Sequence, residues 1–266
     1  MTEDAAKTLE LGAPWFTGDA RAWLNANLNP HDRIFEIGGG RSTVFFLSRC
    51  VSVRTLEASP VWAGALLEHI ASRPALMRGW SLDFVPCDWQ PTWRTRANGY
   101  WDENDGALDL PSAKALELRY LRQALNPVGA NVLCIDGGLR SHLMVLYTHH
   151  DLFSRFDLVV IDNAERPFTS WWLHRNPPSG FARHDFIVGE FDTKLMPVQE
   201  GKHITTILVR DDRATADPAP ILENQTSWTE DELIPHQLPM KDGDDQARNA
   251  RWAAFIEKEL REYELI

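Results

Sequence analysis

Residues 33–47, RIFEIGGGRSTVFFL, constrain the fold more than any other part of this chain. An apolar run ends at Ile37, and three glycines follow at positions 38–40. Ser42 and Thr43 can then cap a helix that continues through the next apolar residues. Glycine lets the backbone turn sharply and lets a ligand approach without meeting a Cβ atom. The segment therefore predicts the first strand, turn and helix of an α/β sheet, although a plain glycine-rich turn would share this pattern.

The rest of the chain, to residue 210, alternates short apolar runs with segments that carry apolar residues at helical spacing. We predict strands at Arg33–Ile37, Val51–Leu56, Leu82–Pro86, Asn131–Ile135, Leu158–Ile161, His184–Val188 and Thr205–Val209. We predict helices at Arg41–Arg49, Val61–Ser72, Ser112–Ala124 and Leu139–Phe153. This alternation indicates an α/β fold: a doubly wound, mainly parallel, seven-stranded Rossmann-like sheet with helices on both faces.

Two other segments do not follow this alternation. Residues 89–110 contain Gly, Asn, Asp and aromatic residues, and we expect a long loop of the kind that binds ligands. We divide the chain into a domain at 1–210 and a C-terminal region at 211–266, where an extended arm precedes an amphipathic helix at 244–263. Its apolar face should dock on the main domain or on a second subunit, so we predict a homo-oligomer.

Composition narrows the range of partners. The net charge is −11, and an acidic surface repels both phosphate backbones and anionic lipid. We therefore expect a small-molecule substrate, with no nucleic acid and no membrane as partner. Three cysteines without a CxxC spacing argue against a disulfide framework and a zinc site. The N-terminus does not resemble a signal peptide and no apolar run is long enough to span a membrane, so we predict a cytoplasmic protein.

Two acidic residues flank the glycine turn. Glu36 precedes it, and Glu57 ends the second strand, about twenty residues after the glycines, where a carboxylate can accept both ribose hydroxyls of a nucleoside. The chain has no GxxxxGK[ST] motif, so the turn is not a P-loop. A turn between two carboxylates suits a cofactor with a sulfonium and an ammonium group better than a pyrophosphate. The alternative is that Glu57 is a solvated acid at the end of a strand and binds no ligand.

The pattern E-x-G-G-G-x-S-T, followed by an acid at the end of the second strand, resembles the class I S-adenosylmethionine (SAM)-dependent methyltransferases. The resemblance covers residues 32–210, although the turn is GGG where the family has GxGxG. It implies that the first acid and the glycine turn hold the methionine part of SAM, that the second acid holds the ribose, and that an acid after the third strand meets the adenine amino group. The implied cofactor-binding residues are Glu36, Gly38, Gly39, Gly40, Ser42, Thr43, Glu57 and Asp88.

Two later strands also end in acids: Asp136 follows the fourth, and Asp162 and Asn163 follow the fifth. The carboxyl ends of neighbouring parallel strands gather ligands in doubly wound sheets, so we predict that these three residues converge as the catalytic group. Their oxygens would suit Mg²⁺, and the pattern resembles the metal-dependent O-methyltransferases of the catechol and macrocin types. Two alternatives stay open: Asp136 acts as a base without a metal, or the residues form structural turns.

These observations favour a SAM-dependent methyltransferase that methylates an oxygen of a small molecule. An NAD-dependent oxidoreductase is a weaker alternative, because the turn lacks the third glycine of GxGxxG. A non-catalytic cofactor-binding or assembly protein is the other. The candidate proton acceptors are His142, His149, His150 and His203, but histidines on helices are more often structural. Trp171 and Trp172 could form walls of a substrate pocket, but tryptophans on apolar faces more often belong to the core.

Overall fold

The computed structural model describes residues 14–87, 111–188, 203–216 and 244–266. The chain divides into two compact units, Met1–Trp15 with Leu28–Leu143, and Phe16–Asn27 with Met144–Ile266. Asp88, the loop expected at 89–110 and most of the expected arm lie outside the described residues.

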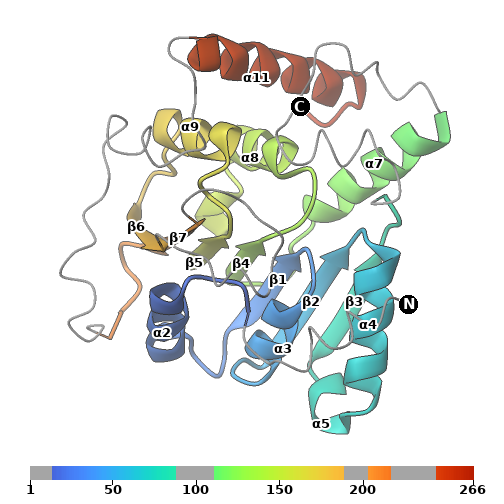
Figure 1. Ribbon diagram of the computed structural model, residues 1–266, viewed down its shortest axis with the longest axis vertical. Helices are drawn as coiled ribbons and strands as arrows, with labels where there is room; N and C mark the ends of the chain where they lie inside the picture. The colour runs from blue at the N-terminus through green and yellow to red at the C-terminus, as the bar shows by residue number, and fades with distance from the viewer. Residues whose placement is uncertain (1–13, 88–110, 189–202, 217–243) are drawn as a thin grey trace. The chain divides into compact units, whose positions relative to one another are not determined.

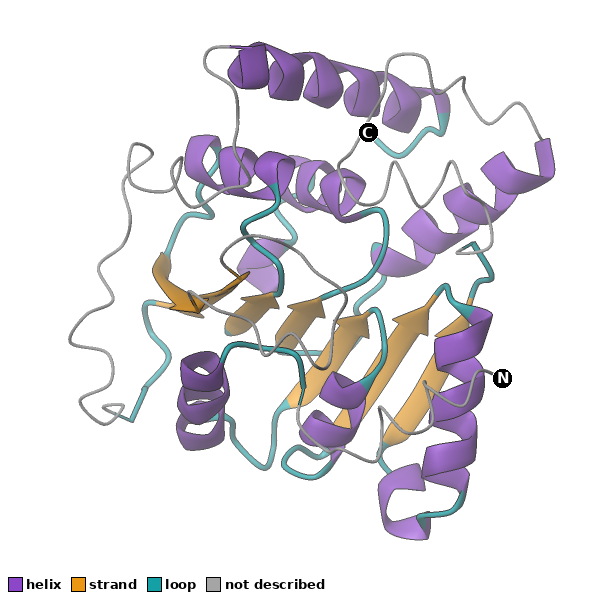
Figure 2. Ribbon diagram, in the orientation of Figure 1, coloured by secondary structure: helices purple, strands orange, loops and turns teal. Residues whose placement is uncertain are grey.

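The first unit is built on four parallel strands. These are β1 (Arg33–Ile37), β2 (Ser52–Glu57), β3 (Trp80–Phe84) and β4 (Val132–Ile135), in the order β3-β2-β1-β4. Its helices are α3 (Arg41–Leu47), α4 (Pro60–Ala71), α5 (Pro74–Met77) and α7 (Pro111–Ala124), and α8 (Arg140–His149) begins within its range. Figure 1 shows α3 and α4 beside β1, β2 and β3, and Figure 2 shows these strands pointing the same way.

Register within this unit brings the polar strand ends together. In β1 every residue after Arg33 is buried, and Glu36 is paired in register with Thr55 of β2 and with Cys134 of β4. Since the strands are parallel, their carboxyl ends meet at one edge of the sheet, and the turns after β1, β2 and β4 share that edge. Polar side chains that are far apart in the sequence are neighbours there.

The second unit is built on an antiparallel arrangement. β7 (His203–Arg210) pairs antiparallel with β5 (Leu158–Ile161) and with β6 (Phe181–Val188). The helical elements of this unit are α2 (Gly18–Asn27), the 3₁₀ turn η1 (Phe153–Arg155), α9 (Pro167–Arg175) and α11 (Asp244–Glu262). α2 packs against β6 and β7, and α11 packs against α9.

The C-terminal helix covers its apolar face within its own chain. Trp252, Ile256 and Leu260 of α11 are buried, and His150 Nε2 lies 2.5 Å from the carbonyl oxygen of Leu265. The prediction that this helix docks on its own chain or on a second copy is thereby met within the chain. Self-association stays a prediction, but the helix face that suggested it is buried within the chain.

The predicted fold class is confirmed: the seven strands have the order β3-β2-β1-β4-β5-β7-β6. β1 to β4 pair in parallel, and β7 pairs antiparallel with β5 and with β6. β3 occupies residues 80–84, two residues earlier than predicted, because Val53 of β2 pairs with Trp80. The prediction missed α2, the short α5 and α9. α9 lies in a Trp-rich segment that opens with a proline, which fits the first turn of a helix but breaks its interior.

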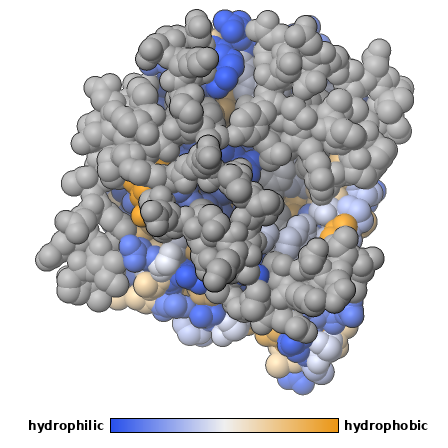
Figure 3. All heavy atoms as spheres, in the orientation of Figure 1, coloured by the Kyte–Doolittle hydropathy of each residue, from blue (hydrophilic) through white to orange (hydrophobic). Residues whose placement is uncertain are grey.

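Three smaller findings complete the description. Cys50, Cys87 and Cys134 are free thiols, as the spacing predicted. None of the helices in the described ranges has the length and apolar character needed to cross a membrane. In Figure 3 hydrophobic residues of the described part appear between hydrophilic neighbours on the visible face, and the exposed large apolar side chains include Val51, Leu67 and Val128.

Candidate functional site

The turn after β1 depends on glycine for steric reasons. Gly38 has φ +92°, and a Cβ there would lie 2.4 Å from the backbone of Gly137, which follows β4. A Cβ on Gly39 would lie 2.6 Å from Thr55 Cγ2. Gly40 is different, since a Cβ there would meet no heavy atom of the described residues within 4 Å. The first two glycines serve the close approach of strand ends, whereas the third faces open space.

The backbone N–H groups of this turn all have partners inside the unit. Gly38 N donates to Leu56 O at 2.8 Å, Gly39 N donates to Glu57 Oε2 at 2.6 Å, and Gly40 N donates to Thr43 Oγ1 at 3.1 Å. Turns that bind phosphate present such N–H groups to the anion. In this turn they donate instead to a backbone carbonyl of β2 and to the side chains of Glu57 and Thr43.

Glu57 fastens the turns after β1 and β2 to each other. Besides the bond from Gly39, its Oε1 accepts from Ala58 N at 2.8 Å and from Ser59 N at 2.6 Å. The residue is buried, and its three donors are backbone groups. The predicted ribose-binding acid is thus also the clamp that shapes the glycine turn.

Glu36 is a fully buried carboxyl group of this unit, and one of its two oxygens has no hydrogen-bond partner among the described residues. Its residue is 0% exposed, and Oε2 accepts from Thr43 Oγ1 at 2.5 Å and from Thr55 Oγ1 at 3.0 Å. Oε1 is buried without a hydrogen-bond partner in the described part of the chain. Burial raises the pKa of Glu36 to about 8, nearby Asp136 adds to the rise, and the hydroxyls of Ser42, Thr43 and Thr55 oppose it.

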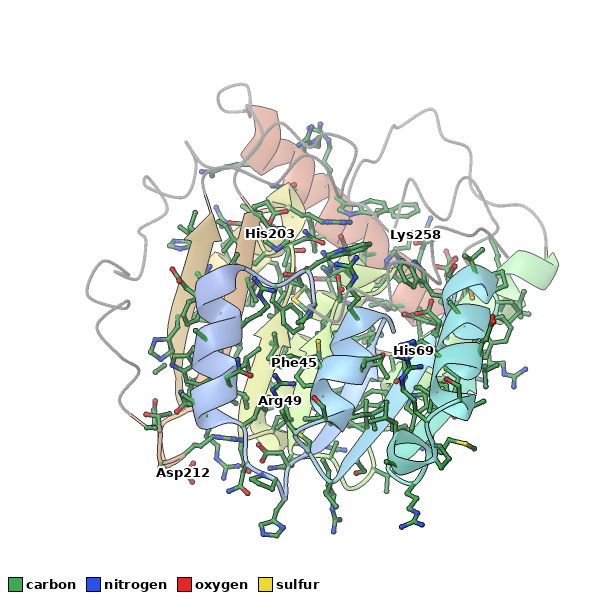
Figure 4. All side chains as sticks on the ribbon, turned by 60° about the horizontal axis from the view of Figure 1, so that its bottom comes forward. Phe45, Arg49, His69, His203, Asp212 and Lys258 are labelled. Atoms are coloured by element: carbon green, nitrogen blue, oxygen red, sulfur yellow. The ribbon has the colours of Figure 1, made fainter. Side chains whose placement is uncertain are left out.

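The basic side chain at the start of α3 faces an aromatic ring. The guanidinium of Arg41 lies 5.8 Å from the ring centre of Trp15. At the other end of the helix, Arg49 lies 3.8 Å from the ring centre of Phe45 and donates to the Phe45 carbonyl, as Figure 4 shows for the labelled pair. Both arginines of this region have aromatic partners, a contact that stabilises a cation.

Asp136, the first predicted catalytic residue, forms a salt bridge. Arg140 in the first turn of α8 donates from Nη2 to Asp136 Oδ1 at 3.1 Å, with side-chain exposures of 2% for Arg140 and 23% for Asp136. A guanidinium at this distance favours the charged form of the carboxylate. Asp136 also belongs to the edge that holds Glu36, since Gly137 meets Gly38 there.

Asp162 and Asn163, the other predicted catalytic residues, belong to the second unit and form a buried network. Asp162 Oδ1 lies 2.8 Å from His203 Nε2 and accepts from Thr205 Oγ1 at 2.9 Å. Asn163, with φ +50°, places its Nδ2 3.2 Å from His203 Nδ1. Because a carboxylate oxygen only accepts hydrogen bonds, Nε2 of His203 is placed to donate to Asp162, and Nδ1 faces the amide nitrogen of Asn163. His203 is labelled at the start of β7 in Figure 4.

The structure therefore brings the predicted residues together in two groups. Glu36, the glycine turn, Thr43 and Glu57 lie in the first unit with Asp136, whereas Asp162 and Asn163 lie in the second. The convergence of all three predicted catalytic residues stays a prediction.

Sequence reasoning missed four partners of these groups: Arg140, Thr55, His203 as a partner of Asp162, and Thr205. Arg140 could have been suspected, because it is the first basic residue after Asp136 and lies only four positions later in the chain. Thr55 and Thr205 required strand register, which the sequence does not state.

The described contacts fit Mg²⁺ poorly. Oxygen ligands of Mg²⁺ must be turned to the ion, and the ion keeps a strict octahedral geometry. Here Asp136 has an arginine partner, Oδ1 of Asp162 has two donors, and the amide nitrogen of Asn163 faces His203. We derive no chemical step through a metal.

No family model matches the chain, and no curated protein matches it. Similar solved structures include an O-methyltransferase from Bacillus cereus in complex with SAH (16% identity, 79% of this chain and 92% of that chain, TM-score 0.46). They also include a precorrin-6y C5,15-methyltransferase from Geobacter metallireducens (12%, 74% and 92%, 0.40) and an rRNA methylase from Streptococcus thermophilus (9%, 72% and 93%, 0.41). These neighbours are methyltransferases of the class that the sequence resembles. Identities and TM-scores at this level show a similar fold and no function.

Proposed function

We propose that the chain binds SAM at the carboxyl ends of β1 and β2 and is a SAM-dependent methyltransferase that acts on an oxygen of a small molecule. The observation that carries the proposal is the Glu36 carboxyl, buried next to the glycine turn with no basic partner among the described residues that touch it. A buried acid in such surroundings is a candidate for a functional group. A cofactor with cationic groups would supply the positive charge that the described contacts of Glu36 lack.

The hydrogen bonds of the turn favour this cofactor over a dinucleotide. A pyrophosphate needs backbone donors at the turn, and Gly39 N and Gly40 N already donate to Glu57 and Thr43. The carboxyl group of Glu57 next to the turn would also repel an anion when it is ionised. Both facts weaken the alternative of an NAD-dependent oxidoreductase.

The chemistry proposed for Asp136 requires little of the protein. SAM carries an activated methyl group, so the protein must align donor and acceptor and remove a proton from the acceptor hydroxyl. Asp136 shares an edge with the glycine turn, its side chain is partly exposed, and Arg140 holds it in the charged form that accepts a hydrogen bond from a hydroxyl. We therefore favour Asp136 as a base without a metal, the first of the two alternatives that the sequence left open.

Calorimetric titration with SAM and NADH tests the proposal, with Glu57→Ala compared with Glu68→Ala, an exposed acid on α4. SAM should bind and NADH should not. Loss of the Glu57 carboxylate should weaken SAM binding by about 1.5–3 kcal/mol for each ribose hydroxyl, while Glu68→Ala should bind normally. Unchanged affinity in Glu57→Ala would exclude this site. Binding without methyl transfer to any hydroxylated acceptor would favour the non-catalytic alternative.

A further inference from the structure

Glu36 is buried without a charge of opposite sign in contact with it. The hydroxyls of Thr43 and Thr55 both donate to Oε2, and Oε1 has no hydrogen-bond partner in the part of the chain that the structure describes. An ionised carboxylate in such surroundings is costly, and a buried acid avoids the cost by keeping its proton.

The charged and titratable groups on the elements around Glu36 face other partners or add negative charge. Arg33 is exposed at the far end of β1, and the Cys134 thiol is buried on β4. The other groups have partners of their own. Arg54 forms a salt bridge with Asp83, and Glu57 accepts a hydrogen bond from Gly39. Arg41 lies over the ring of Trp15, and Asp136 forms a salt bridge with Arg140. None of these described contacts brings a cation to Glu36.

We infer that Glu36 exchanges its proton for the cationic end of the cofactor. In the protein without cofactor the carboxyl is neutral. When SAM binds, the O–H bond of Glu36 breaks, the proton goes to solvent, and the carboxylate that remains takes the cation as its partner. The inference rests on the proposed binding of SAM and adds that binding releases a proton.

The coupling sets a pH dependence with a definite sign. Burial raises the pKa of Glu36 to about 8, so at pH 6.5 nearly every empty molecule holds the proton. Binding selects the ionised form, and SAM affinity should therefore rise about tenfold for each pH unit between pH 5.5 and 7. An α-amino group has a pKa of about 7.8, so the ligand itself keeps its charge in this interval.

The experiment is calorimetry of the full chain at pH 6.5 in buffers of different ionisation enthalpy, which counts the protons released. The ligands are SAM, with sulfonium and ammonium groups, S-adenosylhomocysteine, with the ammonium alone, and methylthioadenosine, with neither. SAM should release about one proton and methylthioadenosine none. Release with S-adenosylhomocysteine identifies the ammonium as the partner, and release with SAM alone identifies the sulfonium.

Two variants separate this role from a structural one. Glu36→Gln keeps the shape of the side chain but cannot ionise, so proton release and the pH dependence should both disappear while weaker binding persists. Thr55→Val removes one hydroxyl that favours the ionised form, which should move the pH dependence to higher pH, and Thr55→Ser should restore it.

Three outcomes would overturn the inference. SAM could bind to the wild-type protein without proton release, Glu36→Gln could release the same proton, or methylthioadenosine could release as much as SAM. In each of these cases the proposed function stands. If none of the three ligands binds, the proposed function fails together with the inference.

Discussion

Glu36 in the first unit and Asp162 in the second are both buried acids at the end of a strand, and both accept hydrogen bonds from threonine hydroxyls. They differ in one partner. Asp162 has the imidazole of His203 at 2.8 Å, whereas no basic group contacts Glu36 in the described residues. Asp162 is satisfied within the folded chain, and Glu36 is not.

The comparison shows how the same residue class can serve two purposes. A buried acid with its own base contributes to a fixed network, and removing either partner leaves the other without compensation. A buried acid without a base makes the empty protein less stable at neutral pH, and only a ligand can compensate it. The first arrangement favours a positioning role for Asp162, and the second favours a binding role for Glu36.

The largest effect is expected from breaking the satisfied network. Asp162→Ala removes the acceptor of His203 Nε2 and Thr205 Oγ1 and leaves both buried, which should lower the free energy of unfolding by about 3–5 kcal/mol. Urea denaturation measures this change in the free energy of unfolding. The control is Asp212→Ala, which removes an exposed partner of Arg210 and should cost less than about 1 kcal/mol. Equal effects of the two substitutions would contradict a fixed network at Asp162.

The opposite sign is expected for Glu36→Gln. The pKa of Glu36 is raised from 4.5 to about 8 in the folded protein, so its contribution to stability is full below pH 4.5 and is lost as the pH rises to 8. Glutamine has no such loss. The variant should be more stable than the wild type by about 3 kcal/mol at pH 7, and equally stable near pH 4.

Urea denaturation across this pH range, without cofactor, provides the measurement. A variant less stable than the wild type at pH 7 would mean that Glu36 is ionised and satisfied in the folded protein, as Asp162 is. The distinction between the two acids would then be lost.

A smaller effect on stability, with a large one on binding, is expected for Gly40→Ala. The added Cβ meets nothing within 4 Å and Gly40 has extended backbone, so stability should change by less than about 1 kcal/mol. If the open space belongs to the cofactor, SAM affinity should fall at least tenfold. Gly38→Ala is the contrasting variant, because positive φ and contact with Gly137 should destabilise the fold itself. Normal SAM binding by Gly40→Ala would place the ligand elsewhere.

The smallest effect is expected from chelation. Because the described contacts of Asp136 and Asp162 fit a metal poorly, EDTA should change SAM affinity less than about twofold, and methyl transfer should persist. Asp136→Asn should abolish transfer under the same conditions. Loss of activity in EDTA with recovery in Mg²⁺ would restore the metal-dependent alternative, and a fully active Asp136→Asn, Asp162→Asn double variant would exclude both.

The sequence predicted much of the fold because its signals are local. Apolar runs located all seven strands, most clearly β4 and β5, which are buried at every position. The glycine turn and its two acids were also readable, because sharp turns restrict which residues can stand there. α9 was missed because its aromatic residues and opening proline do not show a simple helical period.

What the sequence by itself determined is the set of residues at the strand ends: the glycines, Glu36, Glu57, Asp136 and Asp162. Only the tertiary structure decided what each acid touches. Strand register places Thr55 beside Glu36 and Thr205 beside Asp162, and antiparallel pairing brings His203 to the end of β5. The physical reason is that a carboxyl group's charge depends on its desolvation and on donors from distant parts of the chain, and neither quantity is local in sequence.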